Sequence, residues 1–162
     1  MIAVEIAPVE AAHVAELVRI RQTPEVFARW GAIDDLFPFD DPDATVYSVL
    51  VDGAVRGLVQ FSEETTPMYR HAGIDIVLHP DIHGRGIGPE AIRVLARHLF
   101  DERGHHRIVI DPNAANTHAI HAYEKVGFRR VGTLRQYEFH EDRGWTDGVL
   151  LDLLRDELTD AP

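Results

Sequence analysis

A glycine-rich loop placed directly before a helix constrains this chain more than any other part of its sequence. The run His-Gly-Arg-Gly-Ile-Gly occupies residues 83–88, after a β-rich stretch at residues 74–78. Pro89 follows, and proline is favoured at the first position of a helix because its missing N–H has no partner to lose there. We therefore expect a helix from Pro89 to about Arg103, ended by Gly104.

A short apolar run at residues 107–110 follows this helix, so the order is strand, loop, helix, strand. Such a connection is right-handed and makes its two strands parallel. The predicted fold is α/β (α+β), a mixed, mostly antiparallel sheet flanked by helices, in a single domain over residues 1–162. Further strands are expected at 3–9, 47–51, 54–62 and between 128 and 155, and further helices at 11–21, 24–30 and 116–126.

Composition excludes several classes of function. The chain has no cysteine, which removes disulfides, thiolate catalysis and cysteine-type zinc sites. Its net charge of −11 argues against nucleic acid and is compatible with a cationic substrate, although the acids are equally explained as a solubilising surface. No apolar stretch approaches the roughly 18 to 20 residues of a membrane helix, and the N-terminus lacks a basic signal segment. We expect a cytoplasmic protein with no membrane partner.

The glycine loop predicts an anion site. Alternating glycines before a helix expose successive backbone N–H groups, and the helix N-terminus adds about half a positive charge. Together they suit a phosphate or diphosphate, and Arg85 can add a charged donor. A nucleotide P-loop would need Lys-Ser or Lys-Thr after its second glycine, and a dinucleotide fingerprint would need glycine where Pro89 stands. A tight loop without a ligand is the remaining alternative.

A second motif about thirty residues later accompanies this loop. Its members are Asn116, Ala119, Tyr123, Gly127 and Phe128. The two motifs, in this order and spacing, resemble those of the GNAT superfamily of N-acetyltransferases over nearly the whole chain. One position departs from the family pattern, because His83 stands where Arg or Gln is usual. A charged contact made by histidine would depend on pH.

The resemblance implies acetyl-CoA as co-substrate. It also implies a splayed parallel pair of strands, Gly73–His79 and Arg107–Asp111, with the pantetheine arm between them. The fourth strand would hold the arm through its backbone, and the amides of residues 85–88 would bind the diphosphate. The cofactor-binding residues implied are Ile76, Val77, Leu78, His83, Gly84, Arg85, Gly86, Ile87, Gly88, Asn116, Ala119 and Tyr123.

Acetyl transfer needs a neutral amine and a proton for the leaving thiolate. A lysine-like amine is neutral in only about one molecule in a thousand at pH 7.4. The resemblance implies that Tyr123 is the general acid; the alternative is a core tyrosine on an apolar helix face. Asp75 and Asp111 are candidates on the amine side, because they can meet at the carboxyl ends of neighbouring strands. Alternatively, Asp111 caps the Asp-Pro turn and Asp75 pairs with an arginine.

Three short motifs bear on the acceptor. Gly73-Ile74-Asp75, Asp111-Pro112, and Val26 with Trp30-Gly31 are similar to aminoglycoside 6′-N-acetyltransferases. That family also carries acids near Glu63 and Glu64. Aminoglycosides are polycations, and Trp30 either packs a sugar ring or lies in the core. The predicted substrate-binding residues are Trp30, Glu63, Glu64, Asp75 and Asp111.

The C-terminal region favours other acceptors. Residues 134–137 and 144–147 resemble the ending of ribosomal-protein N-terminal acetyltransferases and of spermidine acetyltransferases. The three short motifs make an aminoglycoside 6′-amine the leading acceptor, and the C-terminal region keeps a polyamine or a protein N-terminus as alternatives. A non-catalytic acetyl-CoA-binding module is a third hypothesis, and the protein is expected to be a monomer or homodimer.

The ten histidines lack a His-Glu-x-x-His motif, so no metal site is predicted.

Overall fold

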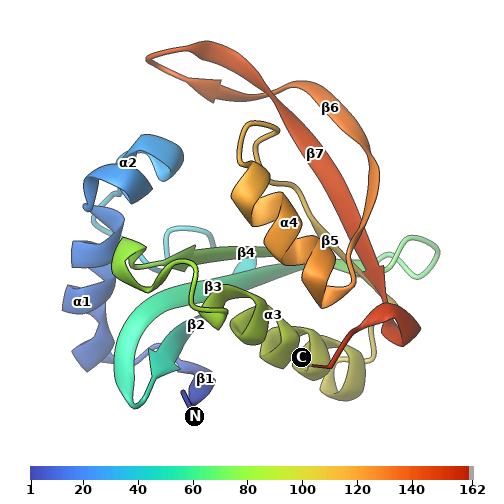
Figure 1. The fold of residues 1–162 in the computed structure, drawn as a ribbon, viewed down its shortest axis with the longest axis horizontal. Coiled ribbons are helices and arrows are strands. Elements are labelled where there is room, and N and C mark those ends of the chain that lie inside the picture. The colour runs from blue at the N-terminus through green and yellow to red at the C-terminus, as the bar shows by residue number, and fades with distance from the viewer. Residues whose placement is uncertain (161–162) are drawn as a thin grey trace.

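Seven strands form one sheet in the order β1-β2-β3-β4-β5-β7-β6 in the computed structural model, which describes residues 1–160 (Figure 1). Every neighbouring pair is antiparallel except β4 and β5. The predicted mixed, mostly antiparallel sheet is confirmed. The strands are β1 (Val4–Pro8), β2 (Ala44–Val51), β3 (Ala54–Glu64), β4 (His71–Leu78), β5 (Arg107–Ile110), β6 (Arg129–His140) and β7 (Gly144–Leu154).

Helices cover both faces of the sheet (Figure 1). Their bounds are Ala11–Arg21 for α1, Pro24–Trp30 for α2, Ile87–Arg97 for α3 and Thr117–Val126 for α4. Alternation along β4 divides the core, because Ile74 packs in the cluster of α3 and α4 whereas Val77 packs in that of α1 and α2. Within residues 1–160, none of the helices has the length and apolar character needed to cross a membrane.

The parallel strands β4 and β5 separate soon after they meet. They pair only at Ala72 with Ile108 and at Gly73 with Val109. Beyond this point β4 stays paired with β3 as far as Leu78, so its other edge has no strand partner in the described part of the chain. Backbone groups on that edge remain available to a ligand. The splayed pair expected from the sequence is confirmed.

The helix after the glycine loop begins two residues earlier than predicted. Gly86 is the N-cap and α3 starts at Ile87, so Pro89 takes the third helical position rather than the first. The reason lies in the loop, where Gly84 and Gly86 have φ values of +75° and +77°. These two glycines, both in the left-handed region, reverse the chain within the loop, so the helix begins directly after Gly86. Past Arg97 the helix continues as a π-helical turn, 98–102.

The β6–β7 hairpin extends beyond the rest of the sheet toward α2 (Figure 1). At its tip, Nη2 of Arg143 donates a hydrogen bond of 3.2 Å to the carbonyl of Ala28. The hairpin and α2 therefore border the region above the carboxyl ends of β4 and β5.

Candidate active site

The glycine loop presents free backbone donors. In the described part of the chain, no acceptor is found for the amides of residues 84–88. A Cβ placed on Gly84 or Gly86 would have no atom of the described residues within 4 Å, so the space beside the loop is open. Free amides, open space and a helix N-terminus fit a diphosphate, and the loop therefore fits the coenzyme that the sequence implies.

His83 introduces this loop as a neutral residue. Partial desolvation lowers the pKa of His83, the charges of Arg29 and His118 act in the same direction, and a hydrogen bond with the Leu78 backbone opposes them. The neutral form of the imidazole is therefore favoured at pH 7, whereas an arginine, one of the two residues expected at this position from the resemblance, would be charged.

Asn116 and Ala119 form the cap of α4. The side-chain oxygen of Asn116 accepts a hydrogen bond of 3.3 Å from the amide of Ala119. This cap gives the spacing of the second motif a structural reason. Their contact with a coenzyme remains a prediction.

Tyr123 lies on α4 and is half-buried. The centroid of its ring is 6.2 Å from the centroid of the Phe128 ring. Burial raises the pKa of Tyr123, and the negative charges of Asp75 and Asp111 raise it further. The phenol is thus part of the core and also close to both predicted carboxylates. It stays protonated throughout the physiological pH range.

Asp75 lies on β4, two residues beyond Gly73, the last residue of β4 that pairs with β5. Its Oδ2 accepts a hydrogen bond of 3.3 Å from the side-chain amide of Gln60 on β3. An arginine partner was one alternative, and the structure places this amide there instead. Burial raises the pKa of Asp75 to about 6, Gln60 opposes the rise, and the charge of Asp111 adds to it.

Asp111 follows β5 and accepts a hydrogen bond from the hydroxyl of Tyr137 on β6. Its charge acts on Asp75, on Tyr123 and on Tyr137. The structure therefore brings together all three residues predicted for catalysis. They come from β4, from the loop after β5 and from α4, beside the gap between the parallel strands.

Three further residues join this site that the sequence did not single out for it. The charges of Asp41 and Glu138 also raise the pKa of Asp75, so this site holds four carboxylates, those of Asp41, Asp75, Asp111 and Glu138. Glu138 is held by a hydrogen bond of 3.1 Å from Nδ2 of Asn113. Tyr137 is the third. A surface of this charge suits a polycationic ligand.

Glu63 and Glu64 are not brought to this cluster. Glu63 pairs with Arg103 and with Nε2 of the buried His105, the latter at 2.5 Å. Its pKa is lowered, chiefly by the hydrogen bond from Arg103. Glu64 is exposed and accepts a hydrogen bond of 2.8 Å from the amide of Thr66. Both carboxylates thus have partners outside the carboxylate cluster, and their role in acceptor binding stays a prediction.

Trp30 has a partner within the protein. The guanidinium carbon of Arg21 lies 5.5 Å from the ring centroids of both Trp30 and Phe37. Arg21 is buried and donates a hydrogen bond of 3.2 Å to the carbonyl of Gly31. Trp30 is therefore partly exposed and is not a core residue. One face of its indole ring is covered by the guanidinium of Arg21 in a cation–π contact, so only the other face could pack a sugar ring.

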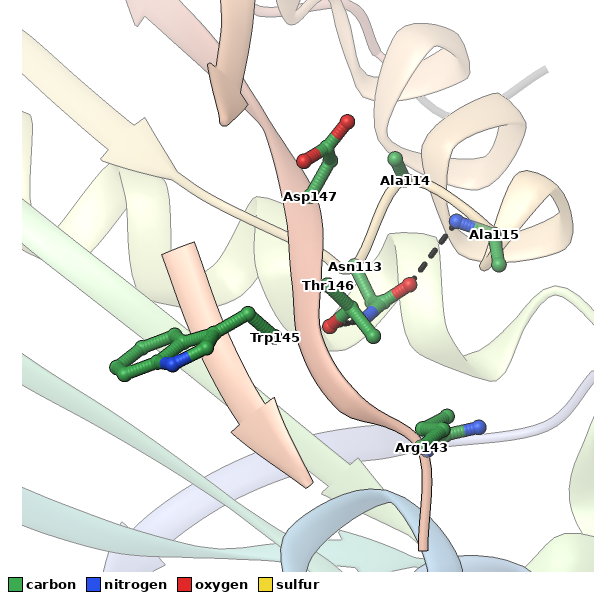
Figure 2. A pocket seen from close by; sticks show the side chains of 7 residues that line it. All are labelled: Asn113, Ala114, Ala115, Arg143, Trp145, Thr146 and Asp147. Atoms are coloured by element: carbon green, nitrogen blue, oxygen red, sulfur yellow. Dashed lines mark hydrogen bonds between the residues drawn. The ribbon is translucent and has the colours of Figure 1, made fainter. Parts of the chain in front are cut away.

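A pocket of about 360 Å³ opens between the loop after β5 and strand β7 (Figure 2). Asn113 braces it, donating to Oγ1 of Thr146 at 2.8 Å and accepting from the amide of Ala115 at 3.0 Å. The indole of Trp145 points away from Ala114 and Ala115 in this view. The pocket is lined by Asn113, Ala114, Ala115, Arg143, Trp145, Thr146 and Asp147.

The left-handed glycines allow a test of the anion site. Gly86→Ala should weaken acetyl-CoA binding by about 10-fold, because a left-handed alanine costs roughly 1–2 kcal/mol and the loop would relax to turn its amides away. Gly132→Ala is the matched control, since Gly132 has open space and no positive φ. Titration calorimetry gives both dissociation constants. Equal values for the two variants would contradict the assignment of the loop.

Comparison with known families bears on the whole arrangement. The model of the acetyltransferase (GNAT) family matches residues 12–128. The matched range includes the glycine loop, the separated strands and the helix that carries Tyr123.

Individual relatives point to amine acetylation. The chain is 40% identical to aminoglycoside N(6′)-acetyltransferase type 1 of Klebsiella pneumoniae over 102 residues, which are 56% of this chain and 50% of that protein. The chain thus spans about half the length of this curated relative. It also superposes on aminoglycoside acetyltransferase AAC(6′)-Ib in complex with coenzyme A, with a TM-score of 0.77 and 24% identity over 96% of both chains.

A second solved structure has a different acceptor. Spermidine N-acetyltransferase from Vibrio cholerae, in complex with CoA and spermine, superposes with a TM-score of 0.81 and 19% identity over 95% of this chain and 96% of that one. At these identities the two structures show a shared fold, and the fold does not distinguish their acceptors.

Proposed function

The chain belongs to the acetyltransferase (GNAT) family, and we propose that it transfers the acetyl group of acetyl-CoA to a primary amine of a cationic small molecule. The observation that carries this proposal is the meeting of Tyr123, Asp75 and Asp111 where the parallel strands separate. The leading acceptor is an aminoglycoside 6′-amine, supported by the curated relative and by the cluster of carboxylates.

The glycine loop and β4 would hold the coenzyme. Acetyl-CoA supplies an activated thioester whose carbonyl carbon is attacked and whose sulfur leaves. The free amides of residues 84–88 would bind its diphosphate, and the unpaired edge of β4 at residues 76–78 would hydrogen-bond the arm. The same edge offers an N–H group to the thioester oxygen, where negative charge develops.

The carboxylate cluster would bind and deprotonate the amine. A cationic acceptor arrives as an ammonium, attracted by Asp41, Asp75, Asp111 and Glu138. Asp75, with a pKa of about 6, is a stronger base than an ordinary aspartate near 3.9 and is still ionised at pH 7. It can take the ammonium proton and leave the nitrogen lone pair free to attack.

Tyr123 would serve the leaving sulfur. As the new C–N bond forms and the C–S bond breaks, the thiolate accepts the phenol proton. Because the pKa of Tyr123 is raised and a thiol is near 8.5, full transfer is uphill, and the hydrogen bond to the developing charge is the larger contribution. The proton taken by the carboxylate restores the phenol through solvent.

A polyamine is the second candidate acceptor, favoured by the similarity to spermidine acetyltransferases. A protein N-terminus remains a third, from the C-terminal motifs alone. The catalytic grouping around Tyr123 disfavours a module that only binds acetyl-CoA.

An amine panel tests the proposal by thiol release from acetyl-CoA. Kanamycin should give the highest kcat/KM, spermidine a lower value and a peptide N-terminus the lowest. An aminoglycoside with a hydroxyl in place of the 6′-amine is the matched control and should release no more thiol than buffer. A preference for spermidine would support the polyamine instead, and no acceptor-dependent release from any amine would contradict enzymatic function.

A further inference from the structure

Strand β6 carries a bulge whose purpose the fold alone does not explain. Its register against β7 shifts between Leu134 and Glu138. Gln136, within the bulge, has a φ of +48° and is one of two non-glycine residues with positive φ in residues 1–160. Bulges re-aim side chains, and residues held in this region of backbone conformation concentrate at functional sites.

Two contacts hold the bulge in place. Oδ1 of Asp147 on β7 accepts a hydrogen bond of 2.9 Å from the amide of Gln136. The ring of Tyr137 lies over Gly148, where a Cβ would come within 2.9 Å of Cδ1 of the ring. Glycine at position 148 is therefore what allows the ring to lie against β7.

The bulge directs the hydroxyl of Tyr137 to Asp111. The phenol donates a hydrogen bond to Oδ2 of that carboxylate. Tyr137 is 49% exposed, so its ring is only half buried against β7. Its hydrogen bond to Asp111, across 26 positions of sequence, is the contact that links the bulge to the predicted amine-side carboxylates.

We propose that Tyr137 is a positioning residue for the acetyl-transfer reaction. Its hydroxyl donates to Oδ2 of Asp111, which fixes the orientation of the carboxylate and leaves Oδ1 for the acceptor amine. This inference rests on the function proposed above and adds to it a residue that holds the amine-binding carboxylate.

Other charged groups surround this pair. The charge of Asp111 acts on Asp75 on β4 and on Tyr123 on α4, and the charge of Glu138 on β6 acts on Asp75 and on Tyr137. A pH–rate profile would therefore report the carboxylates as a group, so the test of Tyr137 compares kcat with KM instead.

Tyr137→Phe removes the hydroxyl alone. We expect kcat to fall by about 10- to 100-fold, the effect of a hydrogen bond to a charged group, with KM for acetyl-CoA within about twofold. Tyr69→Phe is the matched control, because Tyr69 is 68% exposed in the loop between β3 and β4. Its kcat and KM should equal those of the wild type.

Gly148→Ala provides an independent test. The added methyl group would displace the Tyr137 ring and should reproduce the loss seen in Tyr137→Phe. In the double variant, the alanine should lower kcat by less than about twofold further, because the hydroxyl is already absent.

The outcomes separate this inference from the proposed function. If the wild type acetylates no amine, the proposed function fails. If the wild type is active and Tyr137→Phe equals it, the inference is overturned. It is also overturned if KM for acetyl-CoA rises together with the fall in kcat, since Tyr137 would then act on the structure of the site as a whole. A thermal unfolding midpoint within about 2 °C of the wild type shows that the fold is intact.

Discussion

Replacing Tyr123 with phenylalanine should lower kcat by about 100-fold or more, the usual contribution of a proton donor. The phenol of Tyr123 lies close enough to Asp75 and Asp111 to feel their charges, and burial together with those charges keeps it protonated. Phenylalanine retains the ring, whose centroid lies 6.2 Å from that of the Phe128 ring, so packing in the core should be preserved. The dissociation constant of acetyl-CoA should change by less than about twofold.

The measurement is single-turnover acetyl transfer, because it isolates the chemical step from product release. Tyr69→Phe again provides the control, because it removes an exposed hydroxyl in the loop between β3 and β4. Turnover of Tyr123→Phe equal to that of the wild type would remove the residue from catalysis and return it to the core-tyrosine interpretation.

Replacing Asp75 with asparagine should make the protein more stable and less active. A carboxyl whose pKa is about 6 in the folded state and near 3.9 when unfolded binds its proton more tightly in the fold. The stability associated with the protonated carboxyl is therefore fully present below about pH 4 and is lost as pH rises through 6. Asparagine, which never ionises, avoids that loss, which is on the order of 2–3 kcal/mol at pH 7.5.

Thermal unfolding at two pH values checks the sign of this effect. The midpoint of Asp75→Asn should exceed that of the wild type at pH 7.5, and the difference should shrink as pH falls toward 5. Asp35→Asn, which removes an exposed negative charge, should show neither change. The activity of Asp75→Asn should fall by about 10-fold or more, with its inflection near pH 6 lost. A destabilised, fully active variant would contradict the role of this carboxylate.

Sequence patterns predicted the frame of the site because the signals were local. The glycine loop, the helix cap at Asn116 and the helix end at Gly127 are each set by a few neighbouring residues. At Gly127, φ is +119° and a Cβ would lie 2.0 Å from the carbonyl oxygen of Glu157, so glycine is required twice over. The start of α3 was misplaced by two residues because Pro89 is acceptable anywhere in the first turn.

Residues brought in by long-range contacts escaped prediction. Asp41 belongs to an acidic loop that solubility explained equally well, and only the folded chain places its charge near Asp75. Tyr137 depends on a bulge at Gln136, a residue type with no general signal for positive φ. Conversely, Glu63 was expected near the acceptor, and its pairing with His105 across 42 positions could not be inferred from spacing.

The central claim is that the amides of residues 84–88 bind a coenzyme diphosphate. Calorimetric titration tests it with acetyl-CoA and with acetyl-pantetheine, which has the same thioester but no diphosphate. We predict saturable binding of acetyl-CoA, with about 2.7 kcal/mol of added stability at a hundredfold excess over its Kd, and far weaker binding of acetyl-pantetheine. Absence of heat and of thermal stabilisation with acetyl-CoA, or equal affinity for the two compounds, would contradict it.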